Sequence, residues 1–244
     1  MKLVIDIGNT RCKWAIFDDG ILIIKRITTD FTPQIVAQIL GEFGEVGQAI
    51  ISSVRDFPQA CRDLLAERTD YFVELTHQTS IPIINRYKTP NTLGLDRLAA
   101  SVGASSAFPG KPLLVIDAGT AITIDFVSAA NEFIGGNISP GITTRFRALN
   151  QFTGKLPEVD LQDDFEILGT DTISAIRAGV QQGVIFEIDS YIDHYSEQFP
   201  ELVTVLTGGD ALFLAGKIKT TVEIIEDLTL KGLLEILAFN SNNS

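Results

Sequence analysis

Two short segments of the chain each place an aspartate, a glycine and a hydroxyl side chain directly after an apolar run. The first is Asp6-Ile7-Gly8-Asn9-Thr10, which follows Leu3-Val4-Ile5, and the second is Asp117-Ala118-Gly119-Thr120, which follows residues 113–116. Glycine lets a backbone amide approach a ligand closely, consecutive turn amides bind anions, and carboxylate oxygens suit Mg²⁺ or a monovalent cation beside phosphates. We therefore expect the two turns to hold a polyphosphate and its cation from both sides.

The repetition of this pattern distinguishes it from an ordinary hairpin. One Asp-x-Gly turn is typical of a simple connection between strands, but two copies, each opening one half of the chain, favour a functional interpretation. The sequence has no Gly-x₄-Gly-Lys-Ser/Thr and no Gly-x-Gly-x-x-Gly after a strand, which excludes a P-loop and the dinucleotide-binding fingerprint. A third turn, Thr207-Gly208-Gly209-Asp210-Ala211, indicates either a strand-to-helix connection or close approach to a base or ribose.

A separate acidic and basic pair, Asp96-Arg97, follows Leu93-Gly94 at the start of a helical pattern. A carboxylate there can orient an alcohol and accept its proton as phosphoryl transfer proceeds. The neighbouring guanidinium can bind a carboxylate or offset the charge of the phosphoryl group. The alternative is an exposed ion pair favoured by the helix dipole, and the residues alone leave both interpretations open.

Apolar periodicity and turn residues predict the elements that must position these groups. Each half is expected to open with strands joined by tight turns, and Thr32 with Pro33 is typical of a helix start. Strands are expected at 3–5, 13–17, 21–24, 49–54, 71–75, 113–116, 122–127, from 133 on, and 202–206, and helices at 32–47, 57–69, 92–107, 141–152, 171–199 and 231–239. The polar stretch 76–91 is expected to be irregular. Strands mixed with helices in both halves indicate an α/β fold.

Composition narrows the classes of function. The chain has 244 residues, 45% hydrophobic and 20% charged, with a net charge of −12. This is globular composition, and the acidic balance disfavours nucleic acid and anionic membrane as partners. Two cysteines, Cys12 and Cys61, and two histidines exclude a disulfide framework and Cys/His-rich zinc sites. The acidic residue at position 6 and the lack of a long apolar run predict no signal peptide, no spanning helix and a cytoplasmic protein.

The three glycine turns resemble the phosphate-1, phosphate-2 and adenosine motifs of the actin-like and sugar-kinase ATPase superfamily, and their order resembles that of type III pantothenate kinases. The segments that carry the resemblance are the turns themselves, Leu93–Arg97, Gly135–Gly141, Leu156-Pro157 and Gly169–Thr172. The resemblance implies an α/β fold of two duplicated actin-like (ribonuclease H-like) domains with mixed sheets and a cleft between them. It implies an N-terminal domain, 1–108, with the phosphate-1 turn, and a C-terminal domain, 109–244, with the phosphate-2 and adenosine motifs.

The same resemblance implies an enzyme that uses ATP to convert pantothenate to 4′-phosphopantothenate, the first step of coenzyme A biosynthesis. Asp96 would be the general base, and the pantothenate site would comprise Tyr87, Gly94, Leu95, Asp96, Arg97 and Thr172. ATP would be bound by Asp6, Ile7, Gly8, Asn9, Thr10, Arg11, Cys12, Lys13 and Thr120. Asp6 would hold Mg²⁺ through water, and Asp117 would bind a monovalent cation, K⁺ or NH₄⁺. Members of the family act as homodimers, so a homodimer is expected.

The chain departs from the family's pattern at three places. Arg11-Cys12-Lys13 follows the first turn where smaller or neutral residues are more usual, Asp171 stands where Asn is common, and the stretch 71–91 is short. Two other functions stay open: a nucleotide-sensing regulator or scaffold without kinase activity, and a kinase of another small alcohol selected by the loop 76–91. Asp96-Arg97 and the glycine-proline loop 135–141 favour the kinase, because a sensor need not keep them.

Overall fold

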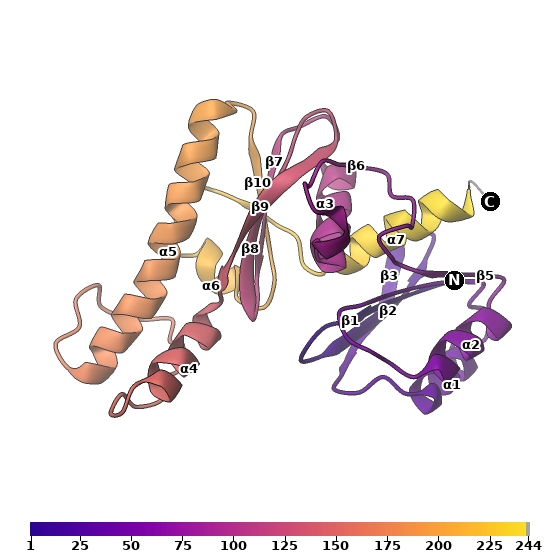
Figure 1. The fold of residues 1–244 in the computed structure, drawn as a ribbon, viewed down its shortest axis with the longest axis horizontal. Helices are drawn as coiled ribbons and strands as arrows, with labels where there is room; N and C mark the ends of the chain where they lie inside the picture. The colour runs from indigo at the N-terminus through magenta and orange to yellow at the C-terminus, as the bar shows by residue number, and fades with distance from the viewer. Residues whose placement is uncertain (243–244) are drawn as a thin grey trace. The chain divides into compact units, whose positions relative to one another are not determined.

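The computed structural model describes residues 1–242 and contains two mixed β-sheets with accompanying helices (Figure 1). The strands are β1 (Lys2–Ile7), β2 (Cys12–Asp18), β3 (Ile21–Thr28), β4 (Gln48–Ser53), β5 (Tyr71–Glu74), β6 (Ile84–Asn85), β7 (Leu113–Ala118), β8 (Ala121–Val127), β9 (Glu132–Pro140), β10 (Val203–Thr207) and β11 (Glu223–Ile224). The helices are α1 (Pro33–Glu42), α2 (Gln59–Arg68), η1 (Pro90–Thr92, a 3₁₀ turn), α3 (Leu95–Ala107), α4 (Ile142–Phe152), α5 (Thr172–Gln198), α6 (Ala211–Ala215) and α7 (Leu228–Ser241). Within this described part of the chain, no helix combines the length and apolar character needed to cross a membrane.

The first sheet has the strand order β3-β2-β1-β4-β5. Its first three strands form an antiparallel meander, and β4 and β5 extend the sheet in parallel with β1. α1 connects β3 to β4, and Thr32 caps it by accepting a hydrogen bond from the N–H of Ile35. Pro33 suits the first helical position, where an N–H would have no helical partner. One face of this sheet packs against α1 and α2 in a single apolar core.

The second sheet repeats this arrangement. Its order is β11-β10-β7-β8-β9-β6, so β7 again lies between an antiparallel partner, β8, and a parallel strand, β10. Its core joins β7, β8 and β10 to α4, α5 and α6, and α5 is the long helix of this unit in Figure 1. The additional strand, β6, pairs in parallel with the start of β9, with Ile84 opposite Glu132. The predicted duplication is therefore confirmed in the strand order.

The opening strand of each sheet is buried along most of its length. In β1, Leu3, Val4 and Ile5 have no exposed surface, whereas Asp6 is partly exposed. In β7, residues 113–116 are at most 1% exposed, and Asp117 is partly exposed. Because burying a charge is costly, each aspartate keeps part of its surface exposed, one residue before its strand ends, although the next residues, Ile7 and Ala118, are still buried.

The chain divides into two compact units that are not contiguous in sequence. The first comprises residues 1–109, 131–133 and the chain from Leu228 on, and the second comprises 110–130 and 134–227. This differs from the expected division, which assigns the C-terminal helix to 109–244. α7 belongs to the first unit because it packs closely against α3, where a Cβ on Gly232 would overlap the carbonyl oxygen of Ala99.

Several elements differ in extent from the sequence-based expectation, among them α1, which ends at Glu42 rather than at 47, and β3, which extends to Thr28 rather than to 24. α7 begins at Leu228 rather than at 231, β9 extends to Pro140, and the two-residue strand β6 lies within the stretch that the sequence predicts to be irregular. β6 forms only by pairing with β9, and α7 packs on α3, from which it is separated in the sequence by the second unit of the chain. Periodicity within a segment carries no information about such partners.

The packing of α3 against α7 predicts a specific loss of stability. Gly232→Ala should lower the free energy of unfolding by about 1–3 kcal/mol, because the added methyl group forces the two helices apart. Urea unfolding followed by circular dichroism measures the change. Gly41→Ala, on an exposed position of α1 where a Cβ meets nothing within 4 Å, is the matched control. It should leave stability unchanged or raise it by about 0.5–1 kcal/mol, and equal losses in both variants would contradict the close contact.

Candidate active site

The first glycine turn connects β1 to β2. The N–H of Gly8 donates to the carbonyl oxygen of Arg11 (3.0 Å), which closes the turn. The side chains of Asn9, Thr10 and Arg11 are exposed, and Lys13 is partly exposed at the start of β2. Amide, hydroxyl and cationic donors therefore surround a turn that begins at a carboxylate.

Two residues of the expected ATP segment, Ile7 and Cys12, have side chains inside the core formed with α1 and α2. Burial raises the pKa of the Cys12 thiol to about 12, although a hydrogen bond with Thr28 opposes the shift. The thiol is therefore neutral at physiological pH. Only the backbone of Ile7 and Cys12 is available to a nucleotide.

The second glycine turn is anchored by the start of α4, directly after the glycine-proline segment 135–141, most of which forms the end of β9. The carbonyl oxygen of Thr120 accepts hydrogen bonds from the N–H of Gly141 (3.0 Å) and from the hydroxyl of Thr144 (2.6 Å). Both donors lie at the start of α4. The backbone of the turn is thus fixed, whereas the Thr120 side chain is exposed.

The third glycine turn packs directly on Asp117. β10 runs parallel to β7 with Thr207 opposite Asp117, and the N–H of Asp210 donates to the carbonyl oxygen of Ala118 (3.0 Å). Gly208 has a φ of 99°, and a Cβ there would lie 2.5 Å from a carboxylate oxygen of Asp117, so only glycine fits. Burial raises the pKa of the Asp210 carboxyl. Two turns far apart in sequence therefore form one polar region around the Asp117 carboxylate.

The acidic and basic pair lies at the N-terminus of α3. Gly94 precedes the helix, Leu95 is its first residue, and the Asp96 carboxylate accepts a hydrogen bond from the N–H of Arg97 (2.9 Å). A negative group in the first helical turn is stabilised by the helix dipole. A Cβ on Gly94 would overlap the same carboxylate oxygen, so the glycine leaves the room that Asp96 occupies. The carboxylate is therefore held in one place while remaining partly exposed to solvent.

The Arg97 side chain is almost fully buried, at 6% exposed, beside two aromatic rings. Its guanidinium carbon lies 5.8 Å from the ring centres of both Tyr87 and Phe133, within the range of a cation–π interaction. The two rings meet edge to face with centres 6.0 Å apart. The structure thus brings the expected Tyr87 and Arg97 together and adds Phe133. Sequence spacing gives no signal for Phe133, because only the β6–β9 pairing brings it near Tyr87.

Thr172 lies in the second unit as the first residue of α5, and its side chain is exposed. The preceding Asp171 caps the helix: its carboxylate accepts hydrogen bonds from the N–H groups of Ser174 (3.1 Å) and Ile173 (2.9 Å). These bonds and the Ser174 hydroxyl lower the pKa of the Asp171 carboxyl. Asp and Asn cap helices about equally well, so an Asp at position 171, where the family commonly has Asn, preserves the local fold.

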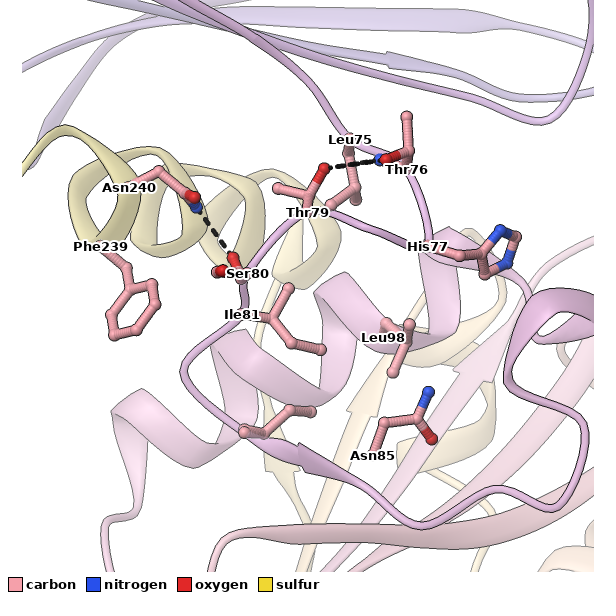
Figure 2. Close-up of a pocket in the computed structure, with 11 residues that line it drawn as sticks. Leu75, Thr76, His77, Thr79, Ser80, Ile81, Asn85, Leu98, Phe239 and Asn240 are labelled. Atoms are coloured by element: carbon pink, nitrogen blue, oxygen red, sulfur yellow. Dashed lines mark hydrogen bonds between the residues drawn. The ribbon is translucent and has the colours of Figure 1, made fainter. Parts of the chain in front are cut away.

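The first unit also contains a cavity that no sequence pattern indicates. It has a volume of about 680 Å³ and lies between the 75–85 segment, Leu98 of α3, and Phe239 and Asn240 of α7 (Figure 2). The segment is tied to α7 by a hydrogen bond from the Asn240 amide to the carbonyl oxygen of Ser80 (2.8 Å). The lining includes no carboxylate, lysine or arginine, so this cavity lacks the charged groups that a nucleotide or an acid requires.

The family model for type III pantothenate kinases matches residues 2–194. The chain belongs to the type III pantothenate kinase family. A type III pantothenate kinase of Phocaeicola vulgatus is 43% identical over 240 residues, which cover 98% of this chain and 99% of that protein. The chain is accordingly a kinase, an ATP-dependent phosphotransferase, and its substrates are ATP and pantothenate.

Solved structures similar to this pantothenate kinase share its fold. A candidate Baf family transcriptional activator from Campylobacter jejuni has a TM-score of 0.62 at 24% identity, covering 98% of this chain and 99% of that one. A candidate 2-dehydro-3-deoxygalactonokinase from Sinorhizobium meliloti has a TM-score of 0.62 at 12% identity, covering 100% and 99%. The expected α/β fold with mixed sheets is therefore confirmed, and these solved structures share it.

The state of the two thiols in this pantothenate kinase can be measured. Iodoacetamide at about pH 8 should leave Cys12 and Cys61 unlabelled in the folded protein, because burial raises both pKa values and excludes the reagent. The raised pKa means that the thiolate forms only as the pH approaches about 12 for Cys12. Labelling at the lower pH should therefore require unfolding in urea, and mass spectrometry counts the added groups. Rapid labelling of the folded chain would contradict the burial of Cys12 in β2 and of Cys61 in α2.

Proposed function

We propose that the chain transfers the terminal phosphoryl group of ATP to the primary hydroxyl of pantothenate, with Asp96 as the general base. The product is 4′-phosphopantothenate, and the reaction is the first step of coenzyme A biosynthesis. The proposal is carried by the N-terminus of α3, where the Asp96 carboxylate is held by the N–H of Arg97, whose guanidinium lies beside Tyr87 and Phe133. A carboxylate that can accept a proton, next to a guanidinium that can bind a carboxylate, suits a substrate that carries both an alcohol and a carboxylate, as pantothenate does.

The proposed role of Asp96 follows from its geometry. One carboxylate oxygen accepts the N–H of Arg97, which fixes the orientation of the group. An alcohol bound against this carboxylate can pass its proton to it as the bond to phosphorus forms. Phosphoryl transfer mainly requires that the reacting groups are positioned and that their charge is stabilised. An aspartate held at a helix start is therefore sufficient as the base.

The remaining pantothenate contacts are proposed around Arg97. Its guanidinium would bind the substrate carboxylate, since planar guanidinium groups pair with carboxylates through two parallel hydrogen bonds. Burial beside the two rings supports this role because a desolvated guanidinium gains more from a carboxylate partner. Tyr87, Gly94 and Leu95 would line the same site, and Thr172 would contribute a hydroxyl from the second unit.

For ATP we propose the segment from Asp6 to Lys13 together with Thr120. The exposed Asn9, Thr10 and Arg11 would donate to phosphate oxygens through their side chains. Ile7, Gly8 and Cys12 would contribute only backbone to the nucleotide site, and the N–H of Gly8 closes the turn on Arg11. The phosphate-1 role belongs to the N-terminal domain, and the phosphate-2 and adenosine roles to the C-terminal domain. The buried, neutral thiol of Cys12 supports the restriction to backbone contacts at that position.

The proposed ions fit the donor groups of each turn. Within residues 1–242, no three His, Cys, Asp or Glu side chains gather to form a metal site of their own. Mg²⁺ bound with nucleotides commonly takes one or two carboxylates, phosphate oxygens and water, so Asp6 suits a water-mediated contact. Asp117, with Gly208 leaving space beside its carboxylate, suits a monovalent cation, K⁺ or NH₄⁺. Such cations would offset phosphate charge, and the two aspartates would orient them.

We propose a cytoplasmic homodimer on the resemblance to the family. Exposed apolar side chains on the second unit, Ile138 at 64%, Phe186 at 53% and Ile173 at 47%, support an interface there. The net charge of −12 is unfavourable for binding nucleic acid. The charge of this chain therefore gives no support to a role in which it binds nucleic acid.

An acceptor panel tests the proposed function. ADP release should require pantothenate, should be absent with simple sugars, acetate or no acceptor, and should increase when potassium is added. Arg97 beside Asp96 gives the physical reason, because only pantothenate in this panel joins a primary alcohol to a carboxylate. Release with a sugar instead would indicate a kinase of another alcohol. Nucleotide binding without release under any condition would indicate a regulator.

Asp96→Asn tests the base. Turnover should fall by about 10²–10⁴-fold, because the amide cannot accept the proton. ATP affinity measured by calorimetry should be preserved, since the Asn oxygen can still accept the Arg97 N–H and keep the helix start folded. Asp63→Asn, at an exposed position of α2, is the matched control and should keep wild-type turnover. Wild-type turnover in Asp96→Asn would remove Asp96 from the mechanism.

A further inference from the structure

The segment 75–85, which lines the cavity of the first unit, also touches the backbone on which the proposed pantothenate residues stand. The imidazole Nε2 of His77 lies 2.9 Å from the carbonyl oxygen of Leu93, directly before Gly94. The side-chain oxygen of Asn85 accepts a hydrogen bond from the N–H of Tyr87 (2.9 Å). In Figure 2 His77 and Asn85 come from the two ends of the chain segment that surrounds the cavity.

The contact of His77 acts on the turn that leads into α3. A carbonyl oxygen only accepts hydrogen bonds, so Nε2 must carry the proton in this contact. Leu93 is 1% exposed, and its N–H donates in turn to the carbonyl oxygen of Pro90 (3.4 Å). Leu93 is therefore held through both of its backbone groups, its N–H by Pro90 and its carbonyl oxygen by His77. The carbonyl belongs to the peptide that joins Leu93 to Gly94, and this peptide leads directly into α3 and Asp96.

The contact of Asn85 acts on the aromatic side of the same site. Asn85 pairs with Phe133 across β6 and β9, and the N–H of Arg86 donates to the carbonyl oxygen of Phe133 (2.9 Å). By holding the N–H of Tyr87, the Asn85 side chain fixes the chain just beyond this pairing. Tyr87 and Phe133 are the rings beside the Arg97 guanidinium, so the direction of the Tyr87 ring depends on this bond.

We propose that His77 and Asn85 are positioning residues for the pantothenate site. Neither side chain touches the acceptor: His77 sets the Leu93–Gly94 peptide ahead of Asp96, and Asn85 sets Tyr87 against Arg97. The inference rests on the proposed function insofar as Tyr87, Asp96 and Arg97 form the pantothenate site. It adds two residues to that site from a loop whose composition predicts only irregular structure.

For His77, two substitutions separate the hydrogen bond from the volume of the side chain. His77→Gln keeps an N–H donor at similar reach, whereas His77→Met has similar length and no donor. His77→Met should lower kcat/KM for pantothenate about five- to tenfold, and His77→Gln should recover most of this loss. KM for ATP should change by less than about twofold in both variants.

For Asn85, two substitutions test the side-chain oxygen that accepts the hydrogen bond from the Tyr87 N–H. Asn85→Asp keeps the oxygen that accepts the Tyr87 N–H, and Asn85→Leu removes it. Asn85→Leu should again lower kcat/KM for pantothenate about five- to tenfold, with KM for ATP nearly unchanged, and Asn85→Asp should stay close to wild type.

The other histidine of the chain provides the control. His194 lies at an exposed position of α5 and contacts Gln198 on the next turn of the same helix (2.8 Å). His194→Met removes an imidazole of the same kind from outside the proposed site and should leave all kinetic constants unchanged. Equal losses in His77→Met and His194→Met would overturn the positioning role.

A measurement independent of activity separates this inference from the proposed function. In the full-length protein, His77→Met should speed amide hydrogen exchange of the peptide spanning residues 93–98, followed by mass spectrometry, and His77→Gln should not. Unchanged exchange, similar kinetics for Gln and Met, or equal effects on the constants for ATP and pantothenate would overturn the inference. Absence of pantothenate phosphorylation by the wild-type protein would instead overturn the proposed function, while the exchange result would still decide whether His77 holds the turn.

Discussion

The two glycine turns of this protein depend on one constraint: an aspartate near the end of a buried strand must keep its carboxylate partly exposed while its neighbours in the strand stay in the core. The apolar residues of β1 and β7 fix these strands within their sheets, and burial of an unpaired charge is costly. Asp6 and Asp117 therefore have defined places at the heads of their turns. In the second unit, Gly208 packs against the Asp117 carboxylate, so that a side chain at this glycine would close the space beside it. Packing of the core thus determines where these two carboxylates, and the phosphate and cation sites proposed at them, lie.

The proposed acceptor site follows from a related restriction on α3. The helix is held by α7, whose Gly232 lies directly on the backbone of Ala99. At its N-terminus, Asp96 is oriented by the N–H of Arg97, and the Arg97 side chain is enclosed beside two rings. Phosphoryl transfer requires positioned groups more than covalent chemistry. A helix start that holds a carboxylate and a guanidinium in fixed places therefore suits the proposed pantothenate site. Membership of the type III pantothenate kinase family agrees with this arrangement.

The sequence predicts those parts of the molecule that are encoded within one segment. The strand-turn pattern at Asp6 and Asp117 predicts the duplicated sheets, and the Thr32 cap predicts the start of α1, because both signals are local. The parts that it does not predict depend on pairing between distant segments. Phe133 reaches the Arg97 region through the β6–β9 pairing, and α7 returns to the first unit by packing on α3. Neither partner is visible in the periodicity of the segment itself.

A crystal structure with pantothenate and a non-hydrolysable ATP analogue would test the proposed role of Asp96. We expect the primary hydroxyl of pantothenate to lie within about 2.6–3.2 Å of an Asp96 carboxylate oxygen, with the substrate carboxylate against Arg97. A hydroxyl beyond hydrogen-bonding reach of Asp96, facing a different carboxylate, would rule out Asp96 as the base.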